Sequence, residues 1–583
     1  MAGGHSVTEP MDAPSVMLRA PASTDARCRL RFWERGLPAL GVAAGILLVA
    51  GPFLATLIRS LLYWAPDGGV SVSLRNFTSL IGDARFQDAA LNTLICGAGT
   101  TVVSCTLGVT LAWIVSRTDV PGRSWFEVGN LIPFFLSPYV GAEAWSYLGS
   151  PNSGILQKLL YDYFGVKAGF LNIFSLGGVI WVLAIFYTPY VYLLVISPLR
   201  RMDAAYEDAA RVHGASFWYT VRHITLPLLM PALLSGATVV FVTSAGLFDV
   251  PFALAATRGI RTVPTEIYSS LQYPADLGRA AAFGMLVLCL TLGLTLWQRH
   301  YLAGRRYETV SGKGYRPRLL RLNRAGRIGA LALEAAYIGL GVVLPVIALL
   351  MVSLSSIWTG RFKLASATLT NYRYVLFDYD LTRTAIVNSL LLAVLGATIG
   401  VGLSILQSYF LNRSRSWLRG VIDAVLMLPI GIPGIILGLG FLILAIRTPL
   451  YSTLTIILIA YVAHCFPLAI RTVSAMFMAL NPELEQSARA SGASWLQTMR
   501  YILLPLLKPA LTAAWLMLFV IFVRELGSTI LLYAQGTETI SVVLVGLGER
   551  NFGFVAALAV VQLVLLLTAF ALLRTTRVSL VQD

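Results

Sequence analysis

Four ionisable residues interrupt long apolar stretches of this sequence: Glu143, Asp249, Arg524 and Glu525. A charged group inside a lipid bilayer is costly, so each such residue is a hypothesis about a pathway or a binding site. The carboxylates could transiently hold a cation that crosses the membrane. Two other interpretations stay open: Arg524 and Glu525 could form a structural pair, and Glu143 and Asp249 could lie exposed at an outer mouth.

Aromatic and soft side chains could serve the same pathway, although packing is the simpler interpretation for all of them. His464 and Cys465 form an isolated pair inside an apolar run, and none of the five cysteines has the spacing of a disulfide framework or a zinc site. The sequence therefore predicts no bound metal. The tyrosines concerned are Tyr139, Tyr187, Tyr190 and Tyr192.

Motifs for enzymatic chemistry are absent from the sequence. No GxxxxGK[ST] loop occurs, and the Gly312-Lys313 pair lacks the upstream glycine that a phosphate-binding loop needs. No HExxH pair and no GxSxG elbow between a strand and a helix occurs either. We therefore expect a non-catalytic chain that binds no cofactor and cannot by itself cradle ATP in the usual way.

The elements that position the charged residues are predicted to be transmembrane helices. Of the 583 residues, 57% are hydrophobic and 12% are charged, whereas a soluble protein carries about 25% charged residues. The formal net charge of +16 does not indicate a nucleic-acid partner, because the basic residues lie between apolar runs. The composition predicts an all-α, polytopic membrane protein in contact with lipid.

About 12 stretches reach the length of roughly 20 mostly apolar residues that a helix needs to cross a bilayer. We predict these spans at 37–58, 91–115, 128–148, 176–198, 228–250, 281–298, 329–353, 385–410, 421–445, 451–472, 506–530 and 555–573. Lysine and arginine gather on the cytoplasmic side of membrane proteins. The connection after the sixth span is rich in them, which predicts that it and both termini are cytoplasmic.

Two segments outside the spans are polar. Residues 1–36 are polar and are predicted to form a flexible cytoplasmic tail. The first apolar stretch begins after them, which is too late for a cleaved signal peptide. Residues 301–327 are predicted to form a basic cytoplasmic linker.

The sequence repeats itself within one cytoplasmic connection of each half. Residues 207–232 (EDAARVHGASFWYTVRHITLPLLMPA) match residues 485–510 (EQSARASGASWLQTMRYILLPLLKPA) at a constant offset of 278. A weaker match lies upstream at an offset of 296, so the first copy must carry an insertion, which we place at 149–174. The weaker pairs are Asn92 with Asn388 and Pro133 with Pro429.

An even number of crossings separates the two copies, so the repeats have the same orientation. We therefore predict two parallel six-helix repeats, at 37–300 and 328–583, around a central pathway.

Each repeated segment has the pattern of two short helices. Gly214 lets the chain turn between them, and Leu226-Pro227 is predicted to end the second. The small residues would let another protein approach closely, and an aromatic residue could anchor a partner groove. A single such loop has an ordinary structural interpretation, but two matched copies on one side favour a docking role. The aromatic candidates are Phe217, Trp218 and Trp495.

At these residues the sequence resembles the permease subunits of bacterial binding-protein-dependent ABC importers. Their signature, E-A-A, three residues, Gly, nine residues and Ile-x-Leu-Pro, is matched by Asp208-Ala209-Ala210, Gly214 and Ile224 to Pro227. The second copy departs from it at Gln486, although a glutamate precedes the triplet in both copies. The residues expected to couple to an ATPase are Glu207, Asp208, Ala209, Ala210, Gly214, Leu226, Pro227, Glu485, Gln486, Ala488, Gly492, Leu504 and Pro505.

The resemblance implies partners and a location. Two copies of a cytoplasmic ABC ATPase subunit would carry ATP and Mg and dock on the repeated segments, and a periplasmic binding protein would deliver the substrate. The chain would lie in the bacterial inner membrane as a fused double permease.

The runs 247–254 and 524–532 resemble the ferric-iron branch of the family, which also includes phosphonate, polyamine and thiosulfate permeases. A different class of function, a nucleotide-independent secondary transporter or channel, predicts broken spans aimed at a midplane site.

Overall fold

The computed structural model describes residues 36–64, 69–167, 169–203, 205–303, 319–414, 416–548 and 551–575. The predicted N-terminal tail up to residue 35 and residues 304–318 of the predicted linker lie outside the described residues.

The first half is helical apart from one short strand pair. It comprises α2 (Leu37–Leu61), β1 (Leu62–Trp64), β2 (Val70–Val72), α3 (Arg75–Ile81), α4 (Ala84–Arg117), α5 (Arg123–Gly129), α6 (Ile132–Phe135), α7 (Pro138–Gly149), α8 (Ile155–Phe164), α9 (Leu176–Arg201), α10 (Ala205–Val212), α11 (Phe217–Thr220), η2 (Val221–Thr225), α12 (Leu226–Gly246), α13 (Asp249–Leu254), η3 (Ala256–Arg258), α14 (Val263–Ser270) and α15 (Leu277–Ala303). The strands β1 and β2 are antiparallel, with Leu62 opposite Val72.

The second half repeats most of this order. It comprises α16 (Arg324–Ile338), η4 (Gly339–Val343), α17 (Leu344–Ser353), η5 (Leu364–Ser366), α18 (Thr370–Arg373), η6 (Tyr374–Asp378), α19 (Asp380–Arg413), α20 (Arg419–Leu426), η7 (Leu428–Gly431), α21 (Gly434–Ala445), α22 (Leu454–Ala479), α23 (Glu483–Ala490), α24 (Trp495–Thr498), η8 (Met499–Leu503), α25 (Leu504–Val523), α26 (Thr529–Leu532), α27 (Ile540–Gly548) and α28 (Phe552–Thr575). The helix α8 lies in the connection where the insertion was predicted, and the connection between α21 and α22 has no helix.

Ten of the predicted spans correspond to helices that are long and apolar enough to cross a membrane within the described residues. The other two are not continuous helices. The stretch 128–148 is divided among α5, α6 and α7, and the stretch 421–445 is bent by 105° between Gly431 and Gly434. Pro138 and Pro433 explain both breaks, since proline pushes the preceding residue out of the helical region. Ser137 has ψ 130° accordingly.

The first long helix of each half packs on both halves, with α2 also contacting α15 and α17 also contacting α28 of its own half. The helix α2 packs on α21 of the second half, and α17 packs on α7 of the first half. Within each half, α4 packs against α9 and α12, and α19 packs against α22 and α25 in the same way. Each half therefore completes the other around the two broken spans.

Matching asparagines confirm the predicted repeat. The side chain of Asn92 donates to the carbonyl oxygen of Arg261 (2.9 Å), and that of Asn388 donates to the carbonyl oxygen of Glu538 (3.0 Å). In both halves the bond ties a long helix to the loop before a short one, α14 or α27.

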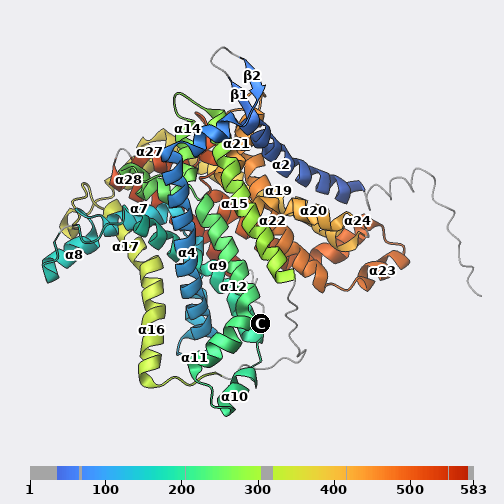
Figure 1. The fold of residues 1–583 in the computed structure, drawn as a ribbon, viewed down its shortest axis with the longest axis horizontal. Coiled ribbons are helices and arrows are strands. Elements are labelled where there is room, and N and C mark those ends of the chain that lie inside the picture. Colours follow the sequence, from blue (N-terminus) through green and yellow to red (C-terminus); the bar gives the residue numbers. More distant parts are fainter. Residues whose placement is uncertain are drawn as a thin grey trace, which may run out of the picture.

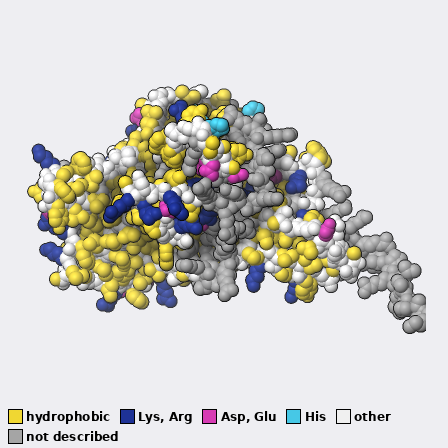
Figure 2. Space-filling model, turned by 90° about the horizontal axis from the view of Figure 1, so that it is seen from below, with side chains coloured by type: hydrophobic (Ala, Val, Ile, Leu, Met, Phe, Trp, Pro, Cys, Tyr) yellow, Lys and Arg dark blue, Asp and Glu magenta, His cyan; other side chains and the backbone are white. Residues whose placement is uncertain are grey.

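The outer surface of the long helices is apolar, as expected of helices that face lipid. Leu47 on α2 and Val102 on α4 are 72% and 66% exposed. In the view from below, hydrophobic side chains cover much of the visible face, and lysines and arginines gather in a band across it (Figure 2).

The two repeated segments lie at the same end of the long helices. Arg117 ends α4 and donates to the carbonyl oxygen of Met202, and its own carbonyl accepts from the amide of Leu320, just before α16. The chain then runs away along α16 and α17 and returns along α19, so the ends of α4 and α19 face one side. The helices α10 and α23 occupy the lower and right-hand edges of the molecule, away from β1–β2 and α8 (Figure 1).

Candidate functional site

Each repeated segment turns at its glycine, as predicted. Gly214 and Gly492 have φ values of +79° and +84°, which residues with a Cβ rarely adopt. The amide of the next residue bonds back across the turn, from Ala215 to Ala210 O (2.9 Å) and from Ala493 to Ala488 O (3.0 Å). Such a left-handed helix ending favours glycine, because glycine has no Cβ to clash in this backbone conformation.

The second short helix of each segment does not end at Leu-Pro, which corrects the expectation for Leu226-Pro227. Ser216 and Ser494 cap its start by accepting the amides of Tyr219 and Gln497 (both 3.3 Å). The helix then continues without a stop through a π-helical turn, η2 or η8, directly before the proline. The wider turn makes room for a ring that would clash in a regular α-helix.

As a result, one continuous helix joins each segment to the centre of the molecule. These helices run from Phe217 to Gly246 and from Trp495 to Val523. Asp249 follows the first within three residues, and Arg524 follows the second directly. The candidate docking segments and the candidate pathway residues are thus at opposite ends of the same two helices.

Each segment exposes small residues together with larger polar and apolar ones. Ala209, Gly214 and Pro227 in the first copy, and Gln486, Gly492 and Pro505 in the second, are exposed, whereas Asp208, Ala210, Leu226, Ala488 and Leu504 are half-buried. Trp495 cannot serve as a surface anchor, because it is 3% exposed and packs edge-on against Tyr409 (5.6 Å between ring centroids). The exposed apolar side chains at these turns include Val212 (85%), Phe217 (44%) and Trp218 (77%) in the first copy and Leu496 (50%) in the second.

The leading glutamates make different bonds in the two copies. Glu485 Oε1 forms an ion pair with Arg413 Nε at 2.6 Å, whereas Glu207 Oε1 accepts from the Thr225 hydroxyl at 3.1 Å. The two arginines were not predicted. Arg117 and Arg413 are separated by the same offset, 296, as Asn92 and Asn388, so the upstream match contained the signal.

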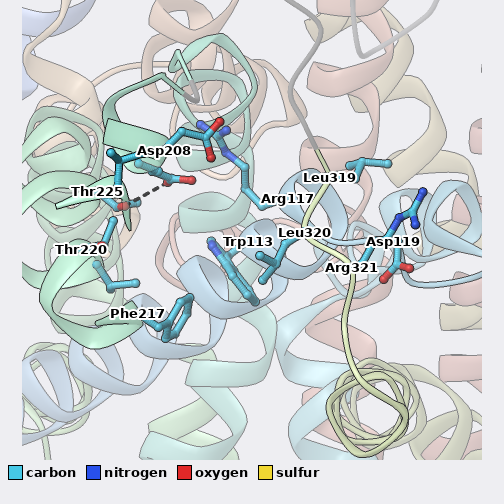
Figure 3. Close-up of a pocket in the computed structure, with 13 residues that line it drawn as sticks. Trp113, Arg117, Asp119, Asp208, Phe217, Thr220, Thr225, Leu319, Leu320 and Arg321 are labelled. Carbon is cyan, nitrogen blue, oxygen red and sulfur yellow. Dashed lines mark hydrogen bonds between the residues drawn. The ribbon is translucent and has the colours of Figure 1, made fainter. Parts of the chain in front are cut away.

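A cavity of about 1050 Å³ lies beside the first segment. Its lining includes Trp113 and Arg117 at the end of α4, Glu207 and Phe217 of the segment, and Leu320 (Figure 3). Leu320 is held there by a parallel bridge to Thr118. At the rim, the amide of Leu322 and the guanidinium of Arg327 hold the pKa of Asp119 below its usual range.

The central charged residues lie where the two broken spans meet. Arg524 Nη1 donates to the carbonyl oxygens of Phe134 (2.5 Å) and Leu136 (2.7 Å), at the first break. Glu525 Oε1 accepts from the amide and the hydroxyl of Ser528, both at 3.1 Å. Gly434, at the second break, is packed against Glu525 and His464.

The interpretation of Arg524 and Glu525 as a structural pair is therefore wrong. Arg524 binds main-chain oxygens of the other half, and Glu525 binds its own turn. Asp249 lies within electrostatic range of both residues; it is 4% exposed, and its Oδ1 has no hydrogen-bond partner. The interpretation of Asp249 as exposed at an outer mouth is wrong for the described structure.

The remaining candidates divide into two groups. Glu143 on α7 lies beside Tyr139 and Tyr147. Tyr187 packs on Tyr190, and both lie within electrostatic range of Arg524, so both belong to the central cluster, whereas Tyr192 is fully buried. His464 is near Glu525, but among the described residues no group of three histidine, cysteine or acidic side chains could hold a metal ion.

Comparison with known proteins gives a family match in both halves. The model of the family described as "binding-protein-dependent transport system inner membrane component" matches residues 104–307 and 393–576. The chain is 24% identical to the Fe(3+)-transport system permease FbpB 2 of Haemophilus influenzae, over 88% of this chain and 91% of that protein. It is 24% identical to the ferric transport permease FbpB of Actinobacillus pleuropneumoniae, over 79% of this chain and 66% of that protein. It is also 32% identical to the molybdenum transport permease ModB of Mycobacterium bovis, over 43% of this chain and 88% of that one.

Proposed function

Because the chain belongs to the family of binding-protein-dependent transport system inner membrane components, we propose that it is the fused permease of an ATP-driven importer for ferric iron. The observation that carries the proposal is the double family match together with two glycine-turned segments at one end of the helices. The chain forms the translocation pathway and hydrolyses no ATP itself. It lies in the bacterial inner membrane with both termini in the cytoplasm.

The partners follow from this arrangement. Two copies of a cytoplasmic ATPase subunit, which carry the ATP and Mg, dock on α10–α11 and α23–α24. A periplasmic binding protein delivers the substrate at the opposite end. The small exposed residues, Ala209 and Gly214 in the first segment and Gly492 in the second, suit a close approach of the partner's backbone.

The continuous helices give the mechanism a physical route. Closure of the ATPase subunits on ATP pushes the two segments together, and the helices from Phe217 and from Trp495 carry that displacement to Asp249 and Arg524. Rearrangement where the broken spans meet then opens the central pathway outward. The coupling comes from the different affinity of each partner for the two states of the pathway.

Docking is tested with the full chain, the ATPase subunit and the binding protein in lipid. We expect Gly214→Leu or Gly492→Leu to reduce binding of the ATPase subunit or the stimulation of its activity, because neither turn tolerates a Cβ. Gly165→Leu is the matched control, since Gly165 also has a positive φ (+66°) but lies after α8 at the other end. Unchanged coupling in the Gly214→Leu, Gly492→Leu double variant would contradict the proposal.

The substrate is tested by stimulation of ATPase activity with loaded binding protein. Ferric iron is the cargo suggested by the relatives named for iron transport, and phosphonate, polyamine, thiosulfate and molybdenum are the alternatives within the class. We expect ferric iron alone to stimulate. Stimulation by one of the other ligands, with none by iron, reassigns the cargo but leaves the family unchanged.

A nucleotide-independent secondary transporter or channel predicted broken spans, and two spans are broken. Broken spans therefore do not distinguish the two classes of function here. Uptake by the chain alone, in the absence of any ATPase subunit, would favour the secondary transporter.

A further inference from the structure

The two repeated segments provide an internal comparison, because the same residues occur twice in different arrangements. In both halves the arginine that ends the long helix donates to a carbonyl oxygen at an equivalent position. Arg117 bonds Met202 O at 2.9 Å, and Arg413 bonds Leu480 O at 3.4 Å. Each arginine therefore fixes the end of α9 or α22, directly before the segment.

The arginine and the leading glutamate form an ion pair in the second copy but not in the first. Glu485, which is 7% exposed, bonds Arg413, and the ring of Trp495 is buried beside them. In the first copy, Arg117 is 3% exposed, and its Nε and Nη1 have no hydrogen-bond partner among the described residues. A buried guanidinium with free donors is costly, and this one faces the cavity that Glu207 also lines.

One of the substitutions between the copies lies at the partner of the glutamate itself. Thr225 offers Glu207 a hydroxyl donor, and the equivalent position in the second copy is Leu503, which offers none. The aromatic residue of the first copy is also less firmly buried than that of the second. Phe217 meets Trp113 at 5.6 Å, as Trp495 meets Tyr409, yet Phe217 stays 44% exposed.

We propose that Arg117 and Arg413 are the positioning residues of the two docking segments, acting through Glu207 and Glu485, and that Thr225 holds the first segment open. In this arrangement α23 is fastened to the end of α19. The helix α10 is fastened only when Glu207 leaves Thr225 for Arg117, and the cavity then closes under Phe217. The first ATPase site is thus adjustable and the second is fixed.

The proposal rests on the proposed function, and its experiment uses the full complex in lipid. The readouts are the amount of ATPase subunit bound and the ratio of ligand-stimulated to basal ATPase rate. Arg413→Gln is expected to lower the stimulated rate about tenfold, the effect of losing one charge-assisted bond, and Arg413→Lys is expected to restore part of it. Equal loss in both variants would contradict a positioning role.

The decisive variant is Thr225→Leu, which gives the first copy the residue of the second. We expect it to lower stimulation several-fold by fastening Glu207 to Arg117, whereas Thr225→Ser keeps the hydroxyl and the wild-type ratio. In an Arg117→Gln background, Thr225→Leu should have no further effect. A loss of the same size in that background would overturn the proposal, because it would reflect packing alone.

The second copy supplies the reciprocal control. Leu503→Thr adds a hydroxyl beside Glu485 and should weaken its pair with Arg413, so that stimulation falls while the amount of bound ATPase subunit is unchanged. Failure of the proposed function gives a different result, since the wild-type chain would then bind no ATPase subunit at all.

Discussion

The guanidinium of Arg524 donates to the carbonyl oxygen of Leu136 across the boundary between the two halves, at 2.7 Å. The same nitrogen, Nη1, donates a second bond to Phe134 O, and the guanidinium lies 5.2 Å from the centroid of the Phe134 ring. A break in a membrane helix leaves carbonyl groups without helical partners. Arg524 supplies the donors that the first break lacks.

Removing these donors should destabilise the chain. Arg524→Gln leaves at least one buried carbonyl unpaired, which costs about 1–3 kcal/mol. We expect a lower thermal unfolding temperature for the purified protein in detergent, measured by loss of the monodisperse peak. Arg447→Gln, at an exposed position after α21, should leave that temperature unchanged. A stable Arg524→Gln variant would show that water satisfies the break.

Asp249 should matter for transport and not for folding. Its carboxyl group is buried with an unpartnered Oδ1, and a buried polar atom without a hydrogen-bond partner destabilises a fold. Asp249→Asn is therefore expected to unfold at the same or a higher temperature, while uptake of ferric iron falls at least several-fold if the carboxylate meets the cation. Full uptake by this variant would remove Asp249 from the pathway.

The two aromatic positions of the docking segments should respond in opposite ways. Trp495→Ala empties a buried site and should cost about 3–5 kcal/mol of stability. Trp218→Ala changes a surface that is 77% exposed, so its stability should stay within about 0.5 kcal/mol, while binding of the ATPase subunit weakens. Pull-down and thermal unfolding of both variants separate the two effects. Normal binding by Trp218→Ala would place the anchor elsewhere on the segment.

Close packing at the second break should be sensitive to a single methyl group. A Cβ at Gly246 would overlap the ring of Pro433, whereas one at Gly293 on α15 would meet nothing within 4 Å. Gly246→Ala is therefore expected to destabilise by about 1–3 kcal/mol, and Gly293→Ala to be neutral or slightly stabilising, because alanine favours helix. Similar unfolding temperatures for both variants would contradict the packing described for α12.

The sequence was sufficient for the features that depend on composition and repetition. Apolar length located ten helices, and the offset of 278 located both glycine turns. The breaks were missed because apolar content does not change across them, although Pro138 and Pro433 marked the places. The bonds of Arg524 could not be predicted from the sequence, since its partners lie in the other half and are main-chain atoms, which no side-chain pattern encodes.

The arginines that face the leading glutamates are an intermediate case. Arg117 and Arg413 recur at the offset of the weaker match, but a basic residue at the end of a membrane helix is ordinary. Only the contact between Arg413 and Glu485 distinguishes Arg413 from an arginine that lies at a helix end merely because basic residues gather on the cytoplasmic side.

The contacts that α2 and α17 make with the opposite half have a consequence for how the sequence could change in evolution. In a permease made from two identical subunits, every substitution occurs on both sides, so the contact surface must stay complementary to itself. In this chain each half contacts a half of different sequence and not an identical copy of itself. A threonine on one side and a leucine on the other, or an extra helix in one copy alone, can persist without any matching change, and the two sides are free to specialise.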